Sequence, residues 1–314
     1  MATHERAHLL PRLVGALENQ EGVGPFEVIV VDDASTDGTW RQLQALARDA
    51  GVLFRPLRLE HNSGPATARN AGWRAARAPL IAFTDDDCTP WQGWLSAIVG
   101  ALRRADLVQG RTLPDPEAPG HGPFSRTLQV TEESGFYQTC NMGYRRDLLE
   151  RLGGFDERFR HPTGEDTDLA WRAREQGAKS VFDGTALVHH DVRPSNFLTH
   201  LRDTPRWEGV VLAVRHHPSL RRHLYRHWFW KDSHPPALLA ALGLALAAKP
   251  RSSPATKLGA LALTLPYVRY RARVNPLGGG PRRRTAAIPA ALIADLAEVG
   301  VMIAASARYR TILL

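Results

Sequence analysis

The most constraining feature of this sequence is an apolar run that leads directly into three aspartates. The run Leu80–Thr84 is followed by Asp85, Asp86 and Asp87. Adjacent carboxylates repel one another, and a bound cation relieves that repulsion. In an extended segment side chains alternate between faces, so Asp85 and Asp87 would point the same way and form half of a Mg²⁺ or Mn²⁺ site. A solvated acidic turn, or a helix cap ahead of Pro90, is the alternative interpretation.

Apolar patterning over the first 190 residues alternates between strands and helices. Continuous β-rich runs predict strands at residues 26–31, 52–59, 80–84, 107–111, 180–182 and 186–189. Apolar residues at helical spacing predict helices at residues 8–17, 39–50, 66–77, 91–103 and 164–176, and another that starts at Arg145. Pro56 marks the second strand as an edge strand. The alternation predicts an α/β domain with a mostly parallel sheet and flanking helices.

The chain has 314 residues and a net charge of +8, but the charge is unevenly distributed. Residues 1–200 contain 22 Lys/Arg and 27 Asp/Glu, whereas residues 201–314 contain 18 and 5. We therefore expect an acidic domain over residues 1–194 and a basic, helical region over residues 195–314. Cys88 and Cys140 provide no disulfide framework, which favours a reducing compartment, and residues 1–8 are too polar for a secretory signal.

Two of the expected strands, at residues 26–31 and 80–84, lead directly into aspartates. If these strands are parallel, both ends face one crevice, which is where open α/β sheets bind ligands. The helix that starts near Pro65 would open at the same crevice and offer backbone N–H groups to an anion, and Arg69 would add a charged contact. Carboxylates that hold a cation beside donors that hold an anion fit a metal-bound diphosphate.

Five segments of the chain occur in the order in which they occur in a known family. They read V-V-D-D-A-S-T-D-G-T from Val30, N-S-G-P-A-T-A-R-N-A-G from Asn62, D-D-D from Asp85, G-G-F-D-E from Gly153 and G-E-D-T-D-L from Gly164. Over roughly residues 3–194 the sequence therefore resembles the family 2 glycosyltransferases. The resemblance implies a GT-A fold, which is Rossmann-like, and an inverting transfer of a sugar from a nucleoside diphosphate to an acceptor hydroxyl.

The resemblance also implies roles for individual residues. Asp85 and Asp87 would hold Mg²⁺ or Mn²⁺ against the diphosphate, and Asp166 would be the general base. The nucleotide side of the site would include Asp32, Asp33, Arg69, Asp86 and Glu165. A family histidine that completes the metal shell matches His190, although His189 and His190 can also be read as surface residues.

Physical chemistry supports these roles for the acids. A divalent cation stabilises the charge that develops on a departing diphosphate, and a carboxylate can take the proton of an attacking hydroxyl. Asp166 would lie near the start of a helix, whose dipole favours its ionised form. The alternative for Glu165 and Asp166 is ordinary helix-start charge, and Asp168 is expected to pair with Arg172.

One element of the family pattern is missing from this sequence. Family members begin with an apolar central strand, and here residues 3–6 correspond to the residues just after it. We expect either a start that lies downstream of the true one or a sheet with an unfilled position. The nucleotide-binding wall would then be incomplete.

The basic region combines short apolar runs with cations and aromatic residues. Runs at residues 237–248 and 258–268 are too short to span a bilayer, and the run at 286–305 contains Asp295 and Glu298. We interpret them as helices that lie in, or dip into, the cytoplasmic leaflet, with basic residues on anionic lipid. An ordinary helical subdomain and a transmembrane hairpin are the alternatives. The absence of a recognised reading module argues against nucleic acid as a partner.

The leading hypothesis is a metal-dependent glycosyltransferase in the cytoplasm, peripheral to or partly embedded in the plasma membrane. Its partners would be a nucleoside-diphosphate sugar, a lipid-linked or cell-envelope glycan acceptor and an anionic membrane surface. A sugar nucleotidyltransferase on a related sheet is a second hypothesis. A catalytically impaired family member that acts as a binding partner is a third.

Overall fold

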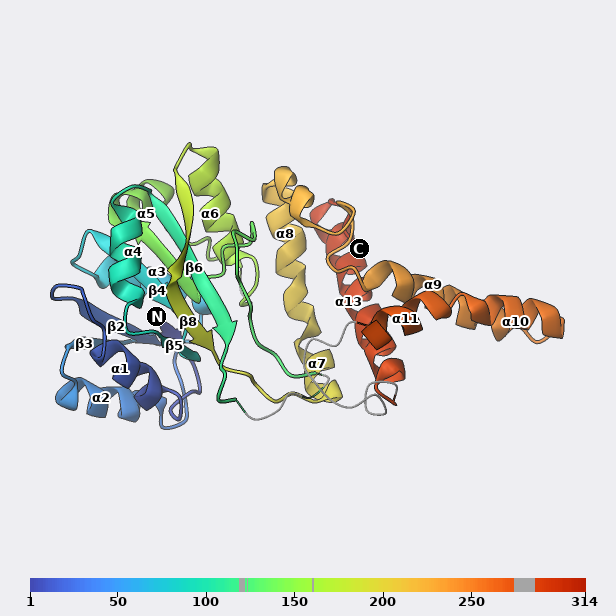
Figure 1. Ribbon diagram of the computed structural model, residues 1–314, viewed down its shortest axis with the longest axis horizontal. Coiled ribbons are helices and arrows are strands. Elements are labelled where there is room, and N and C mark those ends of the chain that lie inside the picture. The colour runs from blue at the N-terminus through green and yellow to red at the C-terminus, as the bar shows by residue number, and fades with distance from the viewer. Residues whose placement is uncertain (119–121, 123, 160, 274–285) are drawn as a thin grey trace. The chain divides into compact units, whose positions relative to one another are not determined.

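The computed structural model describes residues 1–118, 122, 124–159, 161–273 and 286–314. Within this part the chain forms two compact units (Figure 1). Unit 1 comprises Met1–Ala118 and Thr127–Asp191, and unit 2 comprises Pro119–Arg126 and Val192–Leu314. The change from α/β to all-helical structure therefore lies close to the sequence position where the charge changes sign.

The first sheet of unit 1 is entirely parallel, with the order β1-β2-β3. Its strands are β1 (Ala2–Thr3), β2 (Glu27–Asp32) and β3 (Leu53–Arg58), and the helices that alternate with them are α1 (Leu10–Glu18), α2 (Thr39–Asp49) and α3 (Pro65–Ala75). The predicted edge position of the strand that contains Pro56 is confirmed, because β3 has only β2 as a neighbour.

The second sheet has the order β4-β7-β6-β8-β5 and is mixed. Its strands are β4 (Leu80–Thr84), β5 (Cys88–Pro90), β6 (Leu107–Pro114), β7 (Asn141–Arg145) and β8 (Ser180–His190), and its helices are α4 (Trp94–Leu102), α5 (Arg146–Leu152) and α6 (Glu165–Glu175). β6 and β8 are parallel, whereas β7 runs antiparallel between β4 and β6. The sequence patterns did not predict β5, and the two strands expected between residues 180 and 189 are one.

A register shift interrupts the pairing of β8 with β6, because Gly110 pairs with Asp183 and the next residue, Arg111, pairs with Leu187. The shift lies between Gly110 and Arg111 of β6. A Cβ atom at Gly110 would lie 2.5 Å from the carbonyl oxygen of Ala186, so only glycine fits there.

Apolar side chains of α1, α4 and both sheets form the main core of unit 1. Leu10 and Leu13 of α1 and Ile98 of α4 are almost completely buried with Val30 of β2 and Val108 of β6. This core fixes the strand ends relative to one another, because it ties strands of both sheets to the same two helices.

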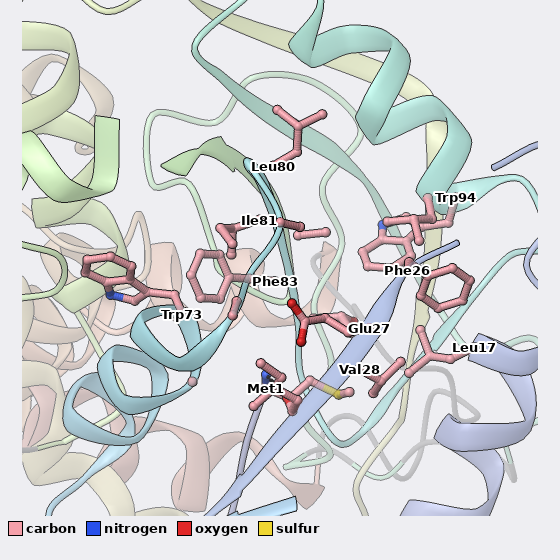
Figure 2. Close-up of a pocket in the computed structure, with 17 residues that line it drawn as sticks. Met1, Leu17, Phe26, Glu27, Val28, Trp73, Leu80, Ile81, Phe83 and Trp94 are labelled. Atoms are coloured by element: carbon pink, nitrogen blue, oxygen red, sulfur yellow. Dashed lines mark hydrogen bonds between the residues drawn. The ribbon is translucent and has the colours of Figure 1, made fainter. Parts of the chain in front are cut away.

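A cavity of about 120 Å³ lies between β2 and β4 and is lined mainly by apolar residues (Figure 2). Val28 and Ile29 border it on one side, Ile81 and Phe83 on the other, and Met1 reaches into it. β1 pairs Ala2 with Val31, so this strand covers only the last two of the six residues of β2. The expectation that the first strand is missing from this sequence is therefore wrong for two of its residues, Ala2 and Thr3, and the described residues leave the remainder of its position open.

The amino terminus lies at the end of this cavity. The Met1 amine donates a hydrogen bond of 2.9 Å to the carbonyl oxygen of Ile29, and Val31 N donates to the Met1 carbonyl at 3.0 Å. Burial lowers the pKa of the Met1 amine to about 6. The amine therefore continues the parallel ladder from β1 into the open position.

The regular elements in the described part of unit 2 are helices, which are accompanied by isolated β-bridges such as the one between Tyr225 and Phe229. Its elements are α7 (Phe197–Asp203), the 3₁₀ helix η1 (Thr204–Trp207), α8 (Glu208–His216), the 3₁₀ helix η2 (Pro218–His223), α9 (His234–Ala247), α10 (Pro254–Ala262), α11 (Leu265–Arg273) and α13 (Ile288–Tyr309). Within the described residues, α13 alone has the length and apolar character to cross a membrane, and core helices of water-soluble proteins share these properties. One face of α13 is buried and carries Asp295 and Glu298.

Candidate active site

Four element ends of unit 1 bring their polar residues to one edge of the two sheets. β2 ends at Asp32, β4 ends just before Asp85, β8 ends at His190 and α6 begins at Glu165. Helix α3 opens at the same edge with Pro65 in its first turn and the left-handed Gly64 (φ 88°) ahead of it. The prediction that both aspartate-bearing strand ends share one crevice is supported by the contacts described next.

Residues 85–87 form a turn rather than an extended segment. Cys88 N donates to the Asp85 carbonyl at 3.2 Å, which closes the turn before β5 begins. The expectation that Asp85 and Asp87 point the same way by strand alternation is therefore wrong in its geometry. Asp85 turns toward Arg69, whereas Asp86 and Asp87 both accept hydrogen bonds from Arg6, at 3.1 and 3.5 Å.

Arg69 connects the aspartate turn to the start of α6. Its guanidinium donates to Asp85 Oδ1 at 3.0 Å and to Glu165 Oε1 at 2.7 Å, and its side chain is only 8% exposed. Burial alone would lower the pKa of Arg69, but the charges of Asp85 and Glu165 raise it well above its usual value. Arg69 is therefore a fixed cation between two acids of the site, and its predicted place near the nucleotide stays a prediction.

Glu165 and Asp166 occupy the first turn of α6. Burial raises the pKa of Glu165 to about 7, against the opposing charge of Arg69. Glu165 Oε2 is buried and has no hydrogen-bond partner in the part of the chain that the structure describes. Asp166 accepts hydrogen bonds from Thr167 N at 2.8 Å and from Thr139 N at 3.3 Å. Burial also raises the pKa of Asp166, which lies within the electrostatic reach of Arg69 and Asp85.

Asp32 and Asp33 lie at the end of β2, and both hold loops in place. The two carboxylate oxygens of Asp33 accept hydrogen bonds from the backbone N–H groups of Ser63 and Gly64, each at 2.8 Å. Asp32 is fully buried and accepts from Ser35 N at 3.1 Å. Asp33 thus orders the loop that leads into α3.

The end of β1 joins Asp33 to the aspartate turn. Asp33 N donates to the carbonyl oxygen of Thr3 at 2.9 Å, and Thr3 Oγ1 donates to Asp86 Oδ2 at 2.7 Å. Burial raises the pKa of Asp86 to about 6. Sequence patterns indicated no role for Thr3 or Arg6. Their position just after a strand that ends at the crevice was the signal that could have identified them.

Asp87 and His190 are the pair of side chains that best fits a cation. The nearest oxygen of Asp87 lies 3.7 Å from His190 Nε2, and ligand atoms of Asp87, Cys88 and His190 all lie within 4.8 Å of one another. The two strands bring them together, since Cys88 of β5 pairs with His190 of β8. Burial raises the pKa of Cys88, so its thiol stays protonated and is a poor ligand for a hard cation.

The donor set around this pair agrees with a Mg²⁺ or Mn²⁺ site. Carboxylate oxygens and one imidazole are suitable ligands, and Asp85, whose side chain is 27% exposed, lies two residues before Asp87. The buried Thr84 Oγ1 and Glu165 Oε2 have no hydrogen-bond partner among the described residues. Unsatisfied buried oxygens at this edge are what a site that binds a polar ligand is expected to contain.

The remaining family-like segments support the start of α6. Asn70 of α3 donates to the carbonyl oxygen of Phe155 and to Glu157, and it accepts a hydrogen bond from Phe155 N. Gly154 has a φ of 81°, and a Cβ atom there would lie 2.4 Å from Asn70 Oδ1. The predicted pair of Asp168 and Arg172 is confirmed at 2.8 Å. We therefore interpret these residues as supports for the start of α6, where Glu165 and Asp166 lie.

Comparisons with solved structures define the class of fold. The chain is similar to the mannosyltransferase PcManGT from Pyrobaculum calidifontis in complex with GDP-Man and Mn²⁺ (TM-score 0.60, 21% identity, 95% of this chain and 85% of that one). It is also similar to S. aureus TarS 1-349 in complex with UDP (TM-score 0.50, 18% identity, 95% and 90%). Unit 1 therefore has the GT-A-like α/β fold of glycosyltransferases.

Comparisons of sequence identify the family. Residues 1–153 match the family described as Glycosyl transferase family 2, and this part of the chain belongs to that family. The "Pre-mycofactocin glycosyltransferase" of Mycobacterium tuberculosis is 34% identical over 232 residues, which are 66% of this chain and 45% of that protein. The "Validoxylamine A glucosyltransferase" of Streptomyces hygroscopicus is 26% identical over 265 residues (71% and 61%). The chain thus spans about half the length of the curated relatives that it matches.

Proposed function

We propose that this protein transfers a sugar from a nucleoside diphosphate to an acceptor hydroxyl, with inversion at the anomeric carbon. The observation that carries the proposal is the position of Arg69 between Asp85 and Glu165, next to Asp166. This contact joins the aspartate turn to the start of the helix that carries the candidate base. Membership of the matched region in the family and the glycosyltransferase names of its relatives support the same activity.

The donor side of the reaction would use the aspartate turn. Asp87, His190 and Asp85 would hold Mg²⁺ or Mn²⁺, which supplies positive charge to the diphosphate as it leaves. Arg69 would face the same negative charge from the α3 side, and the helix start at Pro65 would add its backbone N–H groups. We place Asp32, Asp33 and Asp86 on the nucleoside side, with Asp33 ordering the loop that would border the nucleotide.

Asp166 would act as the general base. Its hydrogen bonds from Thr167 N and Thr139 N hold the carboxylate in a fixed orientation at the start of α6. A raised pKa makes a carboxylate a stronger base, and proton transfer to a positioned base contributes about 10²–10⁴-fold. The positive charge of Arg69 opposes part of the rise that burial causes in the pKa of Asp166.

We further propose that the acceptor is a lipid-linked or cell-envelope glycan and that the enzyme works at the cytoplasmic face of the plasma membrane. The excess of Lys/Arg over Asp/Glu in residues 201–314 supports this location, because anionic lipid attracts such a region. A GT-A-like unit that takes a water-soluble donor, joined to a unit that binds a bilayer, fits an acceptor that is anchored in lipid.

The test is the Asp166→Asn variant, which removes the proton acceptor and keeps the size of the side chain. With UDP- and GDP-sugars, metal and acceptor, release of nucleoside diphosphate should fall by about 10²–10⁴-fold, whereas binding of UDP or GDP should change little. Asp147→Asn, at a largely exposed position on α5, is the matched control.

Turnover that survives in Asp166→Asn would remove the base assignment. Release of pyrophosphate would indicate a nucleotidyltransferase, and nucleotide binding without any turnover by the unaltered protein would indicate a binding partner.

A further inference from the structure

Helices α9, α10 and α11 of unit 2 expose large apolar side chains to solvent. We refer to residues 234–273 as the α9–α11 hairpin. α9 and α10 pack against each other (Figure 1), and α9 has no charged residue from Pro235 to Ala247. The large apolar side chains that this hairpin exposes are Leu242, Leu244, Leu258, Leu261, Leu265 and Val268. Exposed apolar surface of this extent marks a contact with an apolar partner.

Small residues of α9 allow close contact with the neighbouring helices. Ala237 and Ala240 form a buried cluster with Tyr267 of α11, and Leu292 and Leu296 of α13 pack against this cluster. A Cβ atom at Gly243 would lie 2.5 Å from the carbonyl oxygen of Ala260 in α10. The hairpin is therefore packed through these residues, whereas the six large apolar side chains named above each stay at least 37% exposed.

The exposed residues of α10 and α11 lie in two pairs. Leu258 and Leu261 of α10 are three residues apart, as are Leu265 and Val268 of α11, so each pair lies on one side of its own helix. Leu258 is 72% exposed, the second most exposed of the large apolar residues in the described part of the chain. The exposed apolar surface therefore extends over both helices and is not a single apolar spot.

The hairpin itself carries charge of a single sign. Residues 234–273 contain six Lys/Arg and no Asp/Glu. Within the hairpin Lys249, Arg251 and Arg269 are exposed. An apolar protein partner would not require this bias, whereas an anionic lipid surface binds apolar side chains and cations together.

The dimensions of the hairpin determine how it can lie in a bilayer. α9 has 14 residues and is about 21 Å long, which is shorter than the roughly 30 Å hydrocarbon core. The connection between α9 and α10 carries Lys249 and Arg251. If the hairpin inserted into a bilayer with this connection leading, both cations would move toward the middle of the bilayer, which is costly. The hairpin therefore fits a position along the bilayer surface, with leucines in the acyl region and cations among the phosphates.

The base of the hairpin is fixed by buried polar contacts to α13. Tyr267 donates a 2.7 Å hydrogen bond to Asp295, and His234 Nε2 lies 3.3 Å from Glu298. These contacts hold the exposed leucines of the hairpin on a rigid support. Binding of the hairpin to a membrane would therefore cost little conformational entropy.

We propose that the α9–α11 hairpin is a membrane anchor that lies in the interface of an anionic bilayer without crossing it. The inference deepens the proposed function, on which it rests for the location of the acceptor. Its evidence, however, comes from unit 2 alone.

The experiment is flotation of the full-length protein with vesicles of phosphatidylcholine, with and without 30% phosphatidylglycerol, at low and high salt. Binding should be strongest to the anionic vesicles at low salt. The triple variant Leu258→Ser, Leu261→Ser, Leu265→Ser should lose at least about 10-fold in affinity. Lys249→Glu with Arg251→Glu should remove most of the salt dependence and leave a weak residual binding.

The matched control is Leu198→Ser with Ile312→Ser, two exposed apolar positions of unit 2 outside the hairpin, and it should bind as the unaltered protein does. Circular dichroism checks that each variant is folded. No binding by the unaltered protein, or equal loss in the control, would overturn the proposal. A change from dimer to monomer in the triple variant, without vesicle binding, would assign the surface to a second copy of the chain. Donor hydrolysis by the same preparations, measured without vesicles, reports separately on the proposed function.

Discussion

Both units bury charged side chains, but they use them in different ways. In unit 1 the cation Arg69 lies among Asp85, Glu165 and Asp166 at an edge where strands end and oxygens remain without partners. In unit 2 the anion Glu298 lies among Lys231, His200 and His234, and all four residues sit between packed helices. The first cluster lies where strands end and a helix begins, which is where α/β sheets bind ligands, whereas the second ties α7 and α9 to α13. Buried charge therefore indicates a functional site through its position in the fold and not by itself.

Removal of the central cation should have the largest effect on unit 1. In Arg69→Met the carboxylates of Asp85 and Glu165 lose their positive partner, and breaking a buried pair in this way costs roughly 3–5 kcal/mol. Arg74→Met, on the same helix but half-exposed, should change the free energy of unfolding by less than about 0.5 kcal/mol. Urea unfolding of both variants measures the difference. Equal stabilities would show that the Arg69 contacts contribute little to the fold.

Acid should weaken unit 2 through Glu298. Burial alone would raise the pKa of Glu298, but hydrogen bonds from His200 and His234 and the charge of Lys231 hold it well below its usual range. A depressed carboxylate pKa stabilises the fold above the unfolded value of about 4.5, and this stabilisation is lost as the pH falls below it.

The Glu298→Gln variant should therefore lose about 1.5–3 kcal/mol near neutral pH and show a flatter decline in acid. Hydrogen exchange of α9 and α13 between pH 3 and 6 measures the effect locally. A decline in acid as steep as that of the unaltered protein would contradict the assignment.

Filling the open position between β2 and β4 should have a smaller, stabilising effect. Met1 lies opposite Val30, so three residues added before it would lie opposite Ile29, Val28 and Glu27. An added Val-Ile-Val would bury apolar side chains and remove a buried amine, and the cost of ordering the backbone offsets part of the gain. We expect a net stabilisation of about 1–3 kcal/mol by thermal unfolding, and none from an added Gly-Ser-Asp. The same result for both extensions would show that the cavity does not accept a strand.

The sequence predicted most of the elements that carry unit 1, because buried parallel strands are read as apolar runs. β4 was located to the residue, and α6 within one residue of each end. The pattern could not reveal β7 as an antiparallel insertion or β5 as a three-residue strand, because short strands leave too little periodicity. Chain reversals of this kind are decided by tertiary packing.

The sequence indicated which residues would gather at the candidate site but not how their side chains are oriented there. The residues proposed from the family resemblance do meet at one edge, as Arg69, Asp85 and Glu165 show. Strand alternation failed for residues 85–87, since these residues form a turn that separates the directions of Asp85 and Asp87. Arg6 was missed because the strand before it is only two residues long, so the sequence did not show that Arg6 follows a strand that ends near Asp86 and Asp87.

The central claim is that carboxylates from separate parts of unit 1 surround a divalent ion and a diphosphate. The most direct test is calorimetric titration of Mn²⁺ into the protein with UDP or GDP present, for the unaltered chain, Asp87→Asn, His190→Gln and the control Asp147→Asn. The account predicts that Mn²⁺ binds only with the nucleotide present, and that Asp87→Asn and His190→Gln each weaken binding by at least about 10-fold, or about 1.4 kcal/mol. Equal Mn²⁺ affinity in all four proteins would contradict it.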